Sequence, residues 1–380
     1  MTGSDTETKP EPKPAPAPPD PALDDRFMRL ALALGRRGLG HTWPNPAVGA
    51  VIVKNGVILG RGWTQAGGRP HAETEALKRA GRAARGATLY VTLEPCSHQG
   101  KTPPCVDAII RAGIARVVSA MEDPNPEVAG KGHAKLREGR IAVDTGLRAE
   151  EALRSHVGHI RRMREGRPQV LLKLAISADG KAGLAGRKPV GITGDAARAR
   201  VHQMRAETDA ILVGIGTVLS DDPHLTCRLP GMLKLSPVRV VLDAKLRVPM
   251  ATSVVATARE TPTWVFAAPE ASSIAEDILR AKGVEVVRVA GRDGRLDPAE
   301  VVKALAARGI TRLMIEGGPM VAAAFVKADL IDEAALFRSG KPLGGDAIDA
   351  FEGLPLSALK LKSAATEVVG GDTLERFERS

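Results

Sequence analysis

Three side chains that can bind a metal stand in two short segments of the N-terminal half of the chain. His71 belongs to His71-Ala72-Glu73, and two prolines precede the cysteines in Pro95-Cys96 and Pro104-Cys105. An imidazole and two thiolates provide three zinc ligands, and a catalytic zinc keeps its fourth tetrahedral position open for water. Glu73 can lie beside such a metal without binding it and move protons to and from the bound water. We therefore predict His71, Cys96 and Cys105 as zinc ligands and Glu73 as the catalytic residue.

The spacing of these residues follows a known pattern with one difference. His-x-Glu followed by Pro-Cys-x-x-Cys is the signature of zinc deaminases, in which the metal lowers the pKa of its bound water to about 7 for attack on a ring carbon. Here the second cysteine comes nine residues after the first instead of three. Pro95, Pro103 and Pro104 restrict the backbone around both cysteines, as a rigid metal site requires. The segment predicts hydrolytic deamination at a zinc ion.

Asn45 is the best candidate for recognising the edge of a substrate ring. It lies between Pro44 and Pro46, and its amide can both donate and accept hydrogen bonds. An asparagine between two prolines also fits an ordinary turn. His98 follows Cys96 by two positions and either meets the substrate or is merely exposed.

The composition is that of a globular protein with two domains. Hydrophobic residues make up 43% of the 380 residues, and neither an apolar run of membrane-spanning length nor a signal-like segment occurs. We therefore expect a cytoplasmic protein without a membrane partner. Three cysteines cannot form a disulfide framework, and Cys227, which the zinc site leaves over, is interpreted as a half-buried inert thiol.

The net charge of +10 raises the question of nucleic-acid binding. The basic residues are spread along the chain, and aromatic residues, on which bases would stack, make up only 3% of it. A phosphorylated small molecule suits a basic surface equally well. We expect a small-molecule substrate, no nucleic acid and, because enzymes of this size are often symmetric assemblies, a homo-oligomer.

The first half of the chain alternates helices and strands. The proline-rich residues 1–23 are expected to be disordered, and Asp24 is predicted to cap the first helix, which ends near Gly35. Asn55-Gly56 predicts a hairpin, and Thr102 is expected to cap a helix that runs to Gly113. The other predicted elements are a helix from His71 through Ala80, strands 48–53, 57–59, 87–93, 114–120 and 141–143, and a helix before the last strand. This order predicts a mostly parallel sheet covered by helices.

Residues 151–168 are polar and basic and are interpreted as a linker between domains at 24–150 and 169–380. The second domain is another α/β series that does not repeat the first. Its predicted elements are strands 170–177, 210–213, 238–243, 264–267, 284–289 and 313–316, and helices near 195–207, 272–282, 298–308 and 319–328.

Two glycine-containing segments of the second domain suggest ligand binding. Gly214-Ile215-Gly216 lacks the third glycine of a dinucleotide-binding fingerprint, because Leu219 stands there. Glu316-Gly317-Gly318-Pro319 ends a strand and opens a helix, and a helix N-terminus is a favourable place for a phosphate. An ordinary strand-to-helix turn would have the same sequence.

With these residues identified, residues 24–380 resemble the bifunctional deaminase–reductases of riboflavin biosynthesis. The resemblance rests on several motifs in one order, among them Pro44-Asn45-Pro46-Ala47-Val48-Gly49, His71-Ala72-Glu73, Leu93-Glu94-Pro95-Cys96-Ser97-His98, Lys101-Thr102-Pro103-Pro104-Cys105, Asp123-Pro124-Asn125-Pro126, Lys173-Leu174-Ala175, Ile192-Thr193-Gly194 and Glu316-Gly317-Gly318-Pro319. The long cysteine spacing distinguishes this group from the nucleic-acid and cytidine deaminases.

The resemblance implies a fold and a two-step activity. The fold is α/β, with an N-terminal cytidine-deaminase-like α/β/α domain and a C-terminal dihydrofolate-reductase-like α/β domain. The first domain would use Zn²⁺ to deaminate 2,5-diamino-6-(5-phosphoribosylamino)pyrimidin-4-one to 5-amino-6-(5-phosphoribosylamino)uracil. The second would reduce the ribosyl group of that product to a ribityl chain with NADPH.

The resemblance also implies roles for single residues of the second domain. The implied NADPH contacts are Ala175, Thr193, Thr217, Asp221, Gly318, Pro319, Met320, Val321, Ala322, Ala323 and Ala324. The implied substrate contacts, besides Asn45, are Lys173, Arg205, Leu225, Arg228 and Glu316. A guanidinium fork suits the phosphate of a phosphoribosyl group, whereas Lys173 either holds the substrate or carries a proton. Many relatives have tryptophan where this chain has Gly191, a difference that bears on how the cofactor binds.

Two alternatives remain open at this point. One is a monofunctional zinc deaminase that acts on a nucleotide or on RNA and has a non-catalytic C-terminal domain. The other is a nucleic-acid-binding protein with a structural zinc, which would need a fourth protein ligand.

Overall fold

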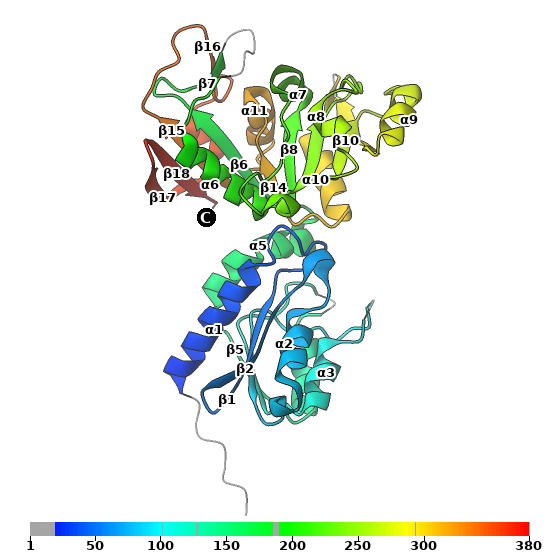
Figure 1. Ribbon diagram of the computed structural model, residues 1–380, viewed down its shortest axis with the longest axis vertical. Coiled ribbons are helices and arrows are strands. Elements are labelled where there is room, and N and C mark those ends of the chain that lie inside the picture. The colour runs from blue at the N-terminus through cyan, green and yellow to red at the C-terminus, as the bar shows by residue number, and fades with distance from the viewer. Residues whose placement is uncertain (1–19, 101, 127, 185–189, 293, 380) are drawn as a thin grey trace, which may run out of the picture.

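The computed structural model contains two α/β domains connected by a long helix (Figure 1). It describes residues 20–100, 102–126, 128–184, 190–292 and 294–379. Residues 1–19 of the tail that was predicted to be disordered therefore lie outside the described residues. Helix α1 (Pro21–Arg36) begins with Asp20 as its N-cap, and the Asp20 carboxylate accepts hydrogen bonds from the Ala22 and Leu23 amides. The prediction that Asp24 caps this helix is therefore wrong.

Asp24 instead takes part in a buried polar cluster. Tyr90 donates a hydrogen bond to its carboxylate at 2.5 Å, and Arg116 forms a two-pronged ion pair with it at 2.9 and 2.7 Å. Both partners lie on strands of the first domain. These bonds connect α1 to the sheet. They also satisfy the buried carboxylate of Asp24, which would be costly without hydrogen-bonding partners.

A five-stranded sheet forms the first domain, in the order β2-β1-β3-β4-β5. The strands are β1 (Gly49–Lys54), β2 (Val57–Trp63), β3 (Thr88–Val91), β4 (Arg116–Ser119) and β5 (Ala142–Thr145). β1 is antiparallel to both neighbours while β3, β4 and β5 are parallel, so the sheet is mixed rather than mostly parallel. The hairpin is confirmed, since Lys54 pairs with Val57 and both turn residues, Asn55 and Gly56, have positive φ.

Helices cover both faces of this sheet, which confirms the α/β/α arrangement (Figure 1). The helices are α1 and α5 (Ala149–Glu165) on one face, and α2 (Ala72–Ala80), α3 (Cys105–Ala112) and α4 (Lys131–Glu138) on the other. Alternate residues of β1 serve the two cores, because successive side chains of a strand point to opposite faces. Ala50 and Ile52 pack with α2, whereas Val51 and Val53 pack with α1.

Two further local predictions differ from the structure. Helix α3 begins at Cys105 with Pro104 as its N-cap, and Thr102 does not cap it. The polar segment predicted as a linker is largely helical: α5 runs from Ala149 to Glu165 and buries its apolar and histidine face. The connection between the domains is therefore a packed element.

The second domain contains a nine-stranded sheet in the order β11-β10-β9-β8-β14-β6-β15-β18-β17. Its strands are β6 (Gln169–Ile176), β8 (Ala210–Gly214), β9 (Val238–Leu242), β10 (Thr263–Ala267), β11 (Glu285–Arg288), β14 (Arg312–Ile315), β15 (Glu333–Ser339), β17 (Lys362–Val369) and β18 (Asp372–Glu378). All neighbouring pairs from β11 to β15 are parallel, and β18 and β17 add an antiparallel edge. Two small ladders pair β7 (Lys181–Leu184) with β16 (Ala347–Asp349) and β12 (Gly291–Arg292) with β13 (Arg295–Leu296).

Helices also cover this second sheet. They are α6 (Asp195–Ala206), α7 (Ile215–Asp221), α8 (Ser253–Ala256), α9 (Ser273–Ala281), α10 (Pro298–Ala307) and α11 (Pro319–Lys327). α10 and α11 share one apolar cluster with the sheet, and α7, α8 and α9 share another. Within the described residues, no helix combines the length and the apolar character that a membrane span requires.

Gly62 in β2 provides a test of how closely α2 packs against the sheet. A Cβ at this position would lie 2.2 Å from the carbonyl oxygen of Ala72, the first residue of α2. We predict that Gly62→Ala pushes α2 away from the sheet, lowers the stability of the first domain by about 1–3 kcal/mol and reduces zinc retention, because His71 immediately precedes this helix. Thermal unfolding and metal analysis measure the two effects. Gly340→Ala is the control, since a Cβ there meets nothing within 4 Å; equal effects of both variants would contradict the packing argument.

Candidate functional sites

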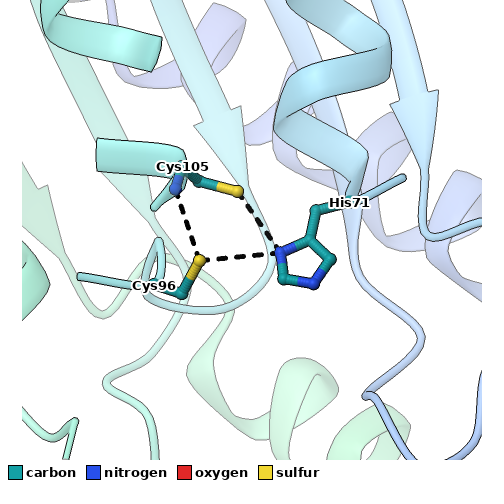
Figure 2. A group of neighbouring side chains, drawn as sticks. All are labelled: His71, Cys96 and Cys105. Atoms are coloured by element: carbon teal, nitrogen blue, oxygen red, sulfur yellow. Dashed lines mark hydrogen bonds between the residues drawn. The ribbon is translucent and has the colours of Figure 1, made fainter. Parts of the chain in front are cut away.

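The three predicted zinc ligands come together from three separate elements (Figure 2). His71 is the N-cap of α2, Cys96 lies in the loop after β3, and Cys105 is the first residue of α3. His71 Nδ1 lies 3.6 Å from the Cys96 sulfur and 3.3 Å from the Cys105 sulfur. The backbone amide of Cys105 also donates to the Cys96 sulfur at 3.3 Å.

These distances fit a zinc ion. Zinc bonds of about 2.0–2.3 Å at tetrahedral angles place neighbouring ligand atoms about 3.6 Å apart. All three ligand atoms lie within 4.8 Å of one another, and no fourth protein ligand joins them in the part of the chain that the structure describes. Three protein ligands leave one position for water, which is the arrangement of a catalytic rather than a structural site.

The pKa values of the two thiols of the cluster shift in opposite directions: the hydrogen bond with Cys96, together with burial, raises the pKa of the Cys105 thiol well above its ordinary value. The pKa of the Cys96 thiol falls to about 4, mainly through its hydrogen bonds with Cys105 and His71, although burial opposes this. Glu73 lies in the first turn of α2 and is buried. Burial raises the pKa of its carboxyl group, while His71 opposes the shift. A carboxyl group held in this way can both accept and release a proton.

Asn45 lies in a loop that packs directly against the approach to His71. Its Nδ2 donates to the Gly68 carbonyl at 2.8 Å, and no hydrogen bond to its Oδ1 is found among the described residues. Gly68 has a φ of +84°, and a Cβ there would lie 2.4 Å from Asn45 Nδ2, so only glycine permits this contact. His98 is exposed.

Two residues near the metal cluster were not assigned a role from the sequence. Glu94 is buried, and its carboxylate accepts hydrogen bonds from the backbone amides of Asp123, Gly130, Gly132 and His133. It therefore ties the segment after β4 to the loop that carries Cys96. Arg69 donates a hydrogen bond to Thr102, which connects the residues before His71 with the loop between the cysteines. The sequence signal for Arg69 was its nearness to His71, whereas Glu94 stands in one of the motifs that carry the family resemblance.

A cleft lies at the carboxyl edge of the second sheet, where parallel sheets commonly bind ligands. Two adjoining cavities of about 180 and 300 Å³ share lining residues and form this cleft. Its lining includes most of the implied NADPH contacts: Ala175, Thr193, Thr217, Asp221, Gly318, Pro319, Met320 and Val321. Small-molecule sites typically enclose about 300–1,000 Å³, so the cleft has the size of such a site. No side chain caps the N-terminus of α11, but Pro319 has no N–H and the Val321 and Ala322 amides donate to the Gly318 carbonyl, so few amides remain there for a phosphate.

A triad of largely buried charged side chains lies at one end of the cleft. Arg205 donates from Nε and Nη2 to the two carboxylate oxygens of Glu316 at 2.7 and 3.0 Å, and Lys173 Nζ lies 3.7 Å from the same carboxylate. Burial alone would raise the pKa of Glu316, but Arg205 and Lys173 outweigh it and bring it to about 2. Burial lowers the pKa of Lys173, and Glu316 opposes that shift.

Several implied contacts of the second domain lie elsewhere. The guanidinium group of Arg205 pairs with Glu316 and also donates to the Thr226 carbonyl, so its contact with a substrate phosphate stays a prediction. Leu225 is buried in an apolar cluster, whereas Arg228 is exposed. Ala322 and Ala323 are buried in α11 and Ala324 is exposed, and none of the three lines the cleft.

The position of Gly191 is open, and the rim of the cleft includes residues that the sequence did not indicate. Among the described residues, a Cβ at Gly191 would meet nothing within 4 Å, so the cleft has room for a larger side chain there. Ile348 and Glu352 line the cleft from the C-terminal part of the chain. Asp179 holds the preceding segment, because it accepts hydrogen bonds from the Leu343 and Gly344 amides.

The two sites define a two-domain enzyme: a zinc-dependent deaminase joined to a reductase. Residues 21–121 match the cytidine and deoxycytidylate deaminase zinc-binding region, and residues 168–374 match the RibD C-terminal domain. The riboflavin biosynthesis protein RibD of Escherichia coli (strain K12) is 42% identical over 335 residues, which cover 85% of this chain and 89% of that protein. RibD of Aquifex aeolicus (strain VF5) is 41% identical and covers 94% of this chain and 99% of its own.

Solved structures agree with these sequence relatives. Acinetobacter baumannii RibD has a TM-score of 0.84 at 34% identity and covers 95% of this chain and 100% of its own. A second similar structure comes from Thermotoga maritima and is a diaminohydroxyphosphoribosylaminopyrimidine deaminase/5-amino-6-(5-phosphoribosylamino)uracil reductase. It has a TM-score of 0.82 at 37% identity, and the match covers 95% of this chain and 99% of that chain. The chain belongs to the RibD family of riboflavin biosynthesis enzymes, with a zinc deaminase domain and an NADPH-dependent reductase domain.

Removing one thiol tests the metal site. We predict that Cys105→Ala reduces the zinc content from one ion per chain to near zero and abolishes ammonia release, because two ligands hold zinc far more weakly than three. Cys227→Ala is the matched control, since Cys227 is buried in the second domain away from the cluster. Metal analysis of both variants after dialysis is the measurement. Full zinc content in Cys105→Ala would exclude this ligand set.

Proposed function

We propose that this chain catalyses two consecutive steps. Residues 24–150 deaminate 2,5-diamino-6-(5-phosphoribosylamino)pyrimidin-4-one hydrolytically, and residues 169–380 reduce the ribosyl group of the product to ribityl with NADPH. The observation that carries this proposal is the cluster of His71, Cys96 and Cys105 with a buried Glu73 beside it. We also propose a cytoplasmic homo-oligomer that acts on this small molecule and not on nucleic acid.

In the first step, water replaces the amino group on the pyrimidine ring, and ammonia leaves. Bound zinc supplies a water of lowered pKa for this attack. Glu73 accepts one proton of the attacking water and passes it to the ring nitrogen; it then takes the second proton from the added hydroxyl group and delivers it to the amino group, which leaves as ammonia. Asn45, whose Nδ2 is fixed by Gly68, offers Oδ1 to an amino group on the ring edge.

In the second step, C1′ of the ribosyl group gains a hydride, its bond to the ring oxygen breaks, and that oxygen gains a proton. NADPH supplies the hydride. We propose that Lys173 donates the proton, since it lines the cleft and Glu316 holds its ammonium group. Arg205 acts by keeping Glu316 ionised and oriented. The exposed Arg228 remains the candidate for binding the substrate phosphate.

The proposal excludes two simpler functions through specific features. A structural zinc would need a fourth protein ligand, which the cluster lacks among the described residues. The second domain places Lys173 and Glu316 in the lining of its cleft, and charged groups with shifted pKa values in a cleft favour a catalytic domain over a non-catalytic one.

The role of Glu73 is tested by Glu73→Gln in the full chain. We predict that this variant keeps its zinc and loses about 10²–10⁴-fold in the rate of ammonia release, because the amide cannot carry the proton. NADPH oxidation with the deaminated compound as substrate is the internal control and should be unchanged. Retention of normal ammonia release would overturn the proposed first step.

The reductase site is tested with a variant that should lose reduction and keep deamination. We predict that Lys173→Met loses about 10²-fold or more in NADPH oxidation, because the proton donor is missing, while ammonia release stays normal. This variant should still bind the cofactor, and the fluorescence of NADPH measures that binding. A variant that still reduces the deaminated compound at the normal rate would remove Lys173 from the mechanism.

A further inference from the structure

The loop of residues 38–46, here called the seam loop, contacts the first site on one side. It connects α1 with β1 and carries Asn45. The amide of Gly67 donates to the His41 carbonyl at 2.8 Å, and Asn45 Nδ2 donates to the Gly68 carbonyl at 2.8 Å. The seam loop is thereby joined to the residues that lead directly into the zinc ligand His71.

The other side of the seam loop contacts the second domain. His41 Nε2 lies 3.1 Å from the carbonyl oxygen of Ala206, the last residue of α6. Burial lowers the pKa of His41, so the neutral ring donates this hydrogen bond through Nε2. The ring of Trp43 packs edge-on against Trp264, with centroids 6.2 Å apart, and belongs to the apolar cluster of the second domain.

The backbones of the two domains approach each other closely at this loop. A Cβ on Gly40 would lie 2.6 Å from the Ala206 carbonyl oxygen, and a Cβ on Gly309 would lie 2.6 Å from Pro44 Cβ. Arg162 of α5 bridges the contact, since it donates to Ala306 O at 2.9 Å and to Pro44 O at 3.4 Å. Such packing leaves the seam loop little freedom to move by itself.

The seam loop has few internal hydrogen bonds, although Pro44 and Pro46 restrict part of its backbone. It forms turns rather than a helix or strand, and within it the backbone bonds are those from His41 N to Gly38 O and from Asn45 N to Thr42 O. Its conformation therefore depends on what packs against it from outside. The described contacts of His41 Nε2 and of the Trp43 ring are with the second domain.

We propose that the reductase domain holds the seam loop in the geometry that deamination requires, with His41 and Trp43 as positioning residues. The proposal rests on the role of Asn45 in the proposed function. A displacement of about 1 Å of a substrate-binding group can lower a rate about 100-fold, so loosening a loop from outside the site is sufficient to impair it. The second domain then serves the first reaction as well as its own.

The test uses full-length His41→Ala and Trp43→Leu, with both activities measured on each preparation. The expected result is a loss of about tenfold or more in kcat/KM for ammonia release, mainly through KM, at unchanged zinc content. Reduction of the deaminated compound should stay within about twofold of normal, because neither residue lines the reductase cleft. His41→Gln should restore deamination, since its amide nitrogen can replace Nε2 as a donor to Ala206.

Arg161→Ala is the matched control for contacts between the domains. Arg161 Nη2 on α5 lies 3.2 Å from the Asp332 carboxylate of the second domain, and neither residue is among the seam-loop contacts described above. This variant should keep normal deamination. A similar loss in Arg161→Ala would overturn the proposal, because it would point to domain docking in general.

The remaining outcomes are equally decisive. Normal ammonia release in both His41→Ala and Trp43→Leu would overturn the proposal, and so would a parallel loss of both activities, which indicates unfolding. The proposed function fails separately, if Glu73→Gln still releases ammonia. When Glu73→Gln is inactive and the seam-loop variants are fully active, only the positioning role is excluded.

Discussion

The structure of the first domain depends on holding two thiols and an imidazole within bonding distance of one metal ion. The three ligands come from α2, a loop after β3 and α3, so the site exists only while these elements keep their places on the sheet. Packing such groups together costs free energy that metal binding offsets, because zinc binding and folding are coupled. Gly62 and Gly68 matter for the same reason, since each lets a backbone approach the segment that carries His71.

Buried carboxylates organise both sites, and each does so with different partners. Glu94 is satisfied by backbone amides and therefore fixes a loop without carrying a free charge into the site. Glu316 is satisfied by Arg205 and Lys173, which keep it ionised and place an ammonium group at the end of the cleft. A buried charge is tolerated only with such partners, so each carboxylate determines the position of its neighbours.

Short-range patterns predicted the parts of the molecule that depend on neighbours in sequence. The zinc ligands, the Asn55-Gly56 hairpin and the order of most strands and helices follow from residue types and spacing. Predictions that depended on distant contacts were less successful. Asp24 is suited to capping a helix, but Asp20 with Pro21 provides the cap, and Asp24 pairs with Arg116 far along the chain. The pairing of Arg205 with Glu316 was not predicted either, because the two residues lie far apart in the sequence. The strands β15, β17 and β18 were not predicted, because their pairing is a property of the sheet and not of their own sequences.

The most direct test of the two-step account follows ammonia and NADPH together in one reaction. The full chain is mixed with the diaminopyrimidine nucleotide and NADPH, with and without prior removal of zinc. The account predicts that ammonia appears first and that one NADPH is oxidised for each ammonia released. The zinc-free chain should release no ammonia and oxidise no NADPH on this substrate, yet oxidise NADPH once the deaminated compound is supplied. NADPH oxidation by the zinc-free chain on the diaminopyrimidine nucleotide itself would contradict the account.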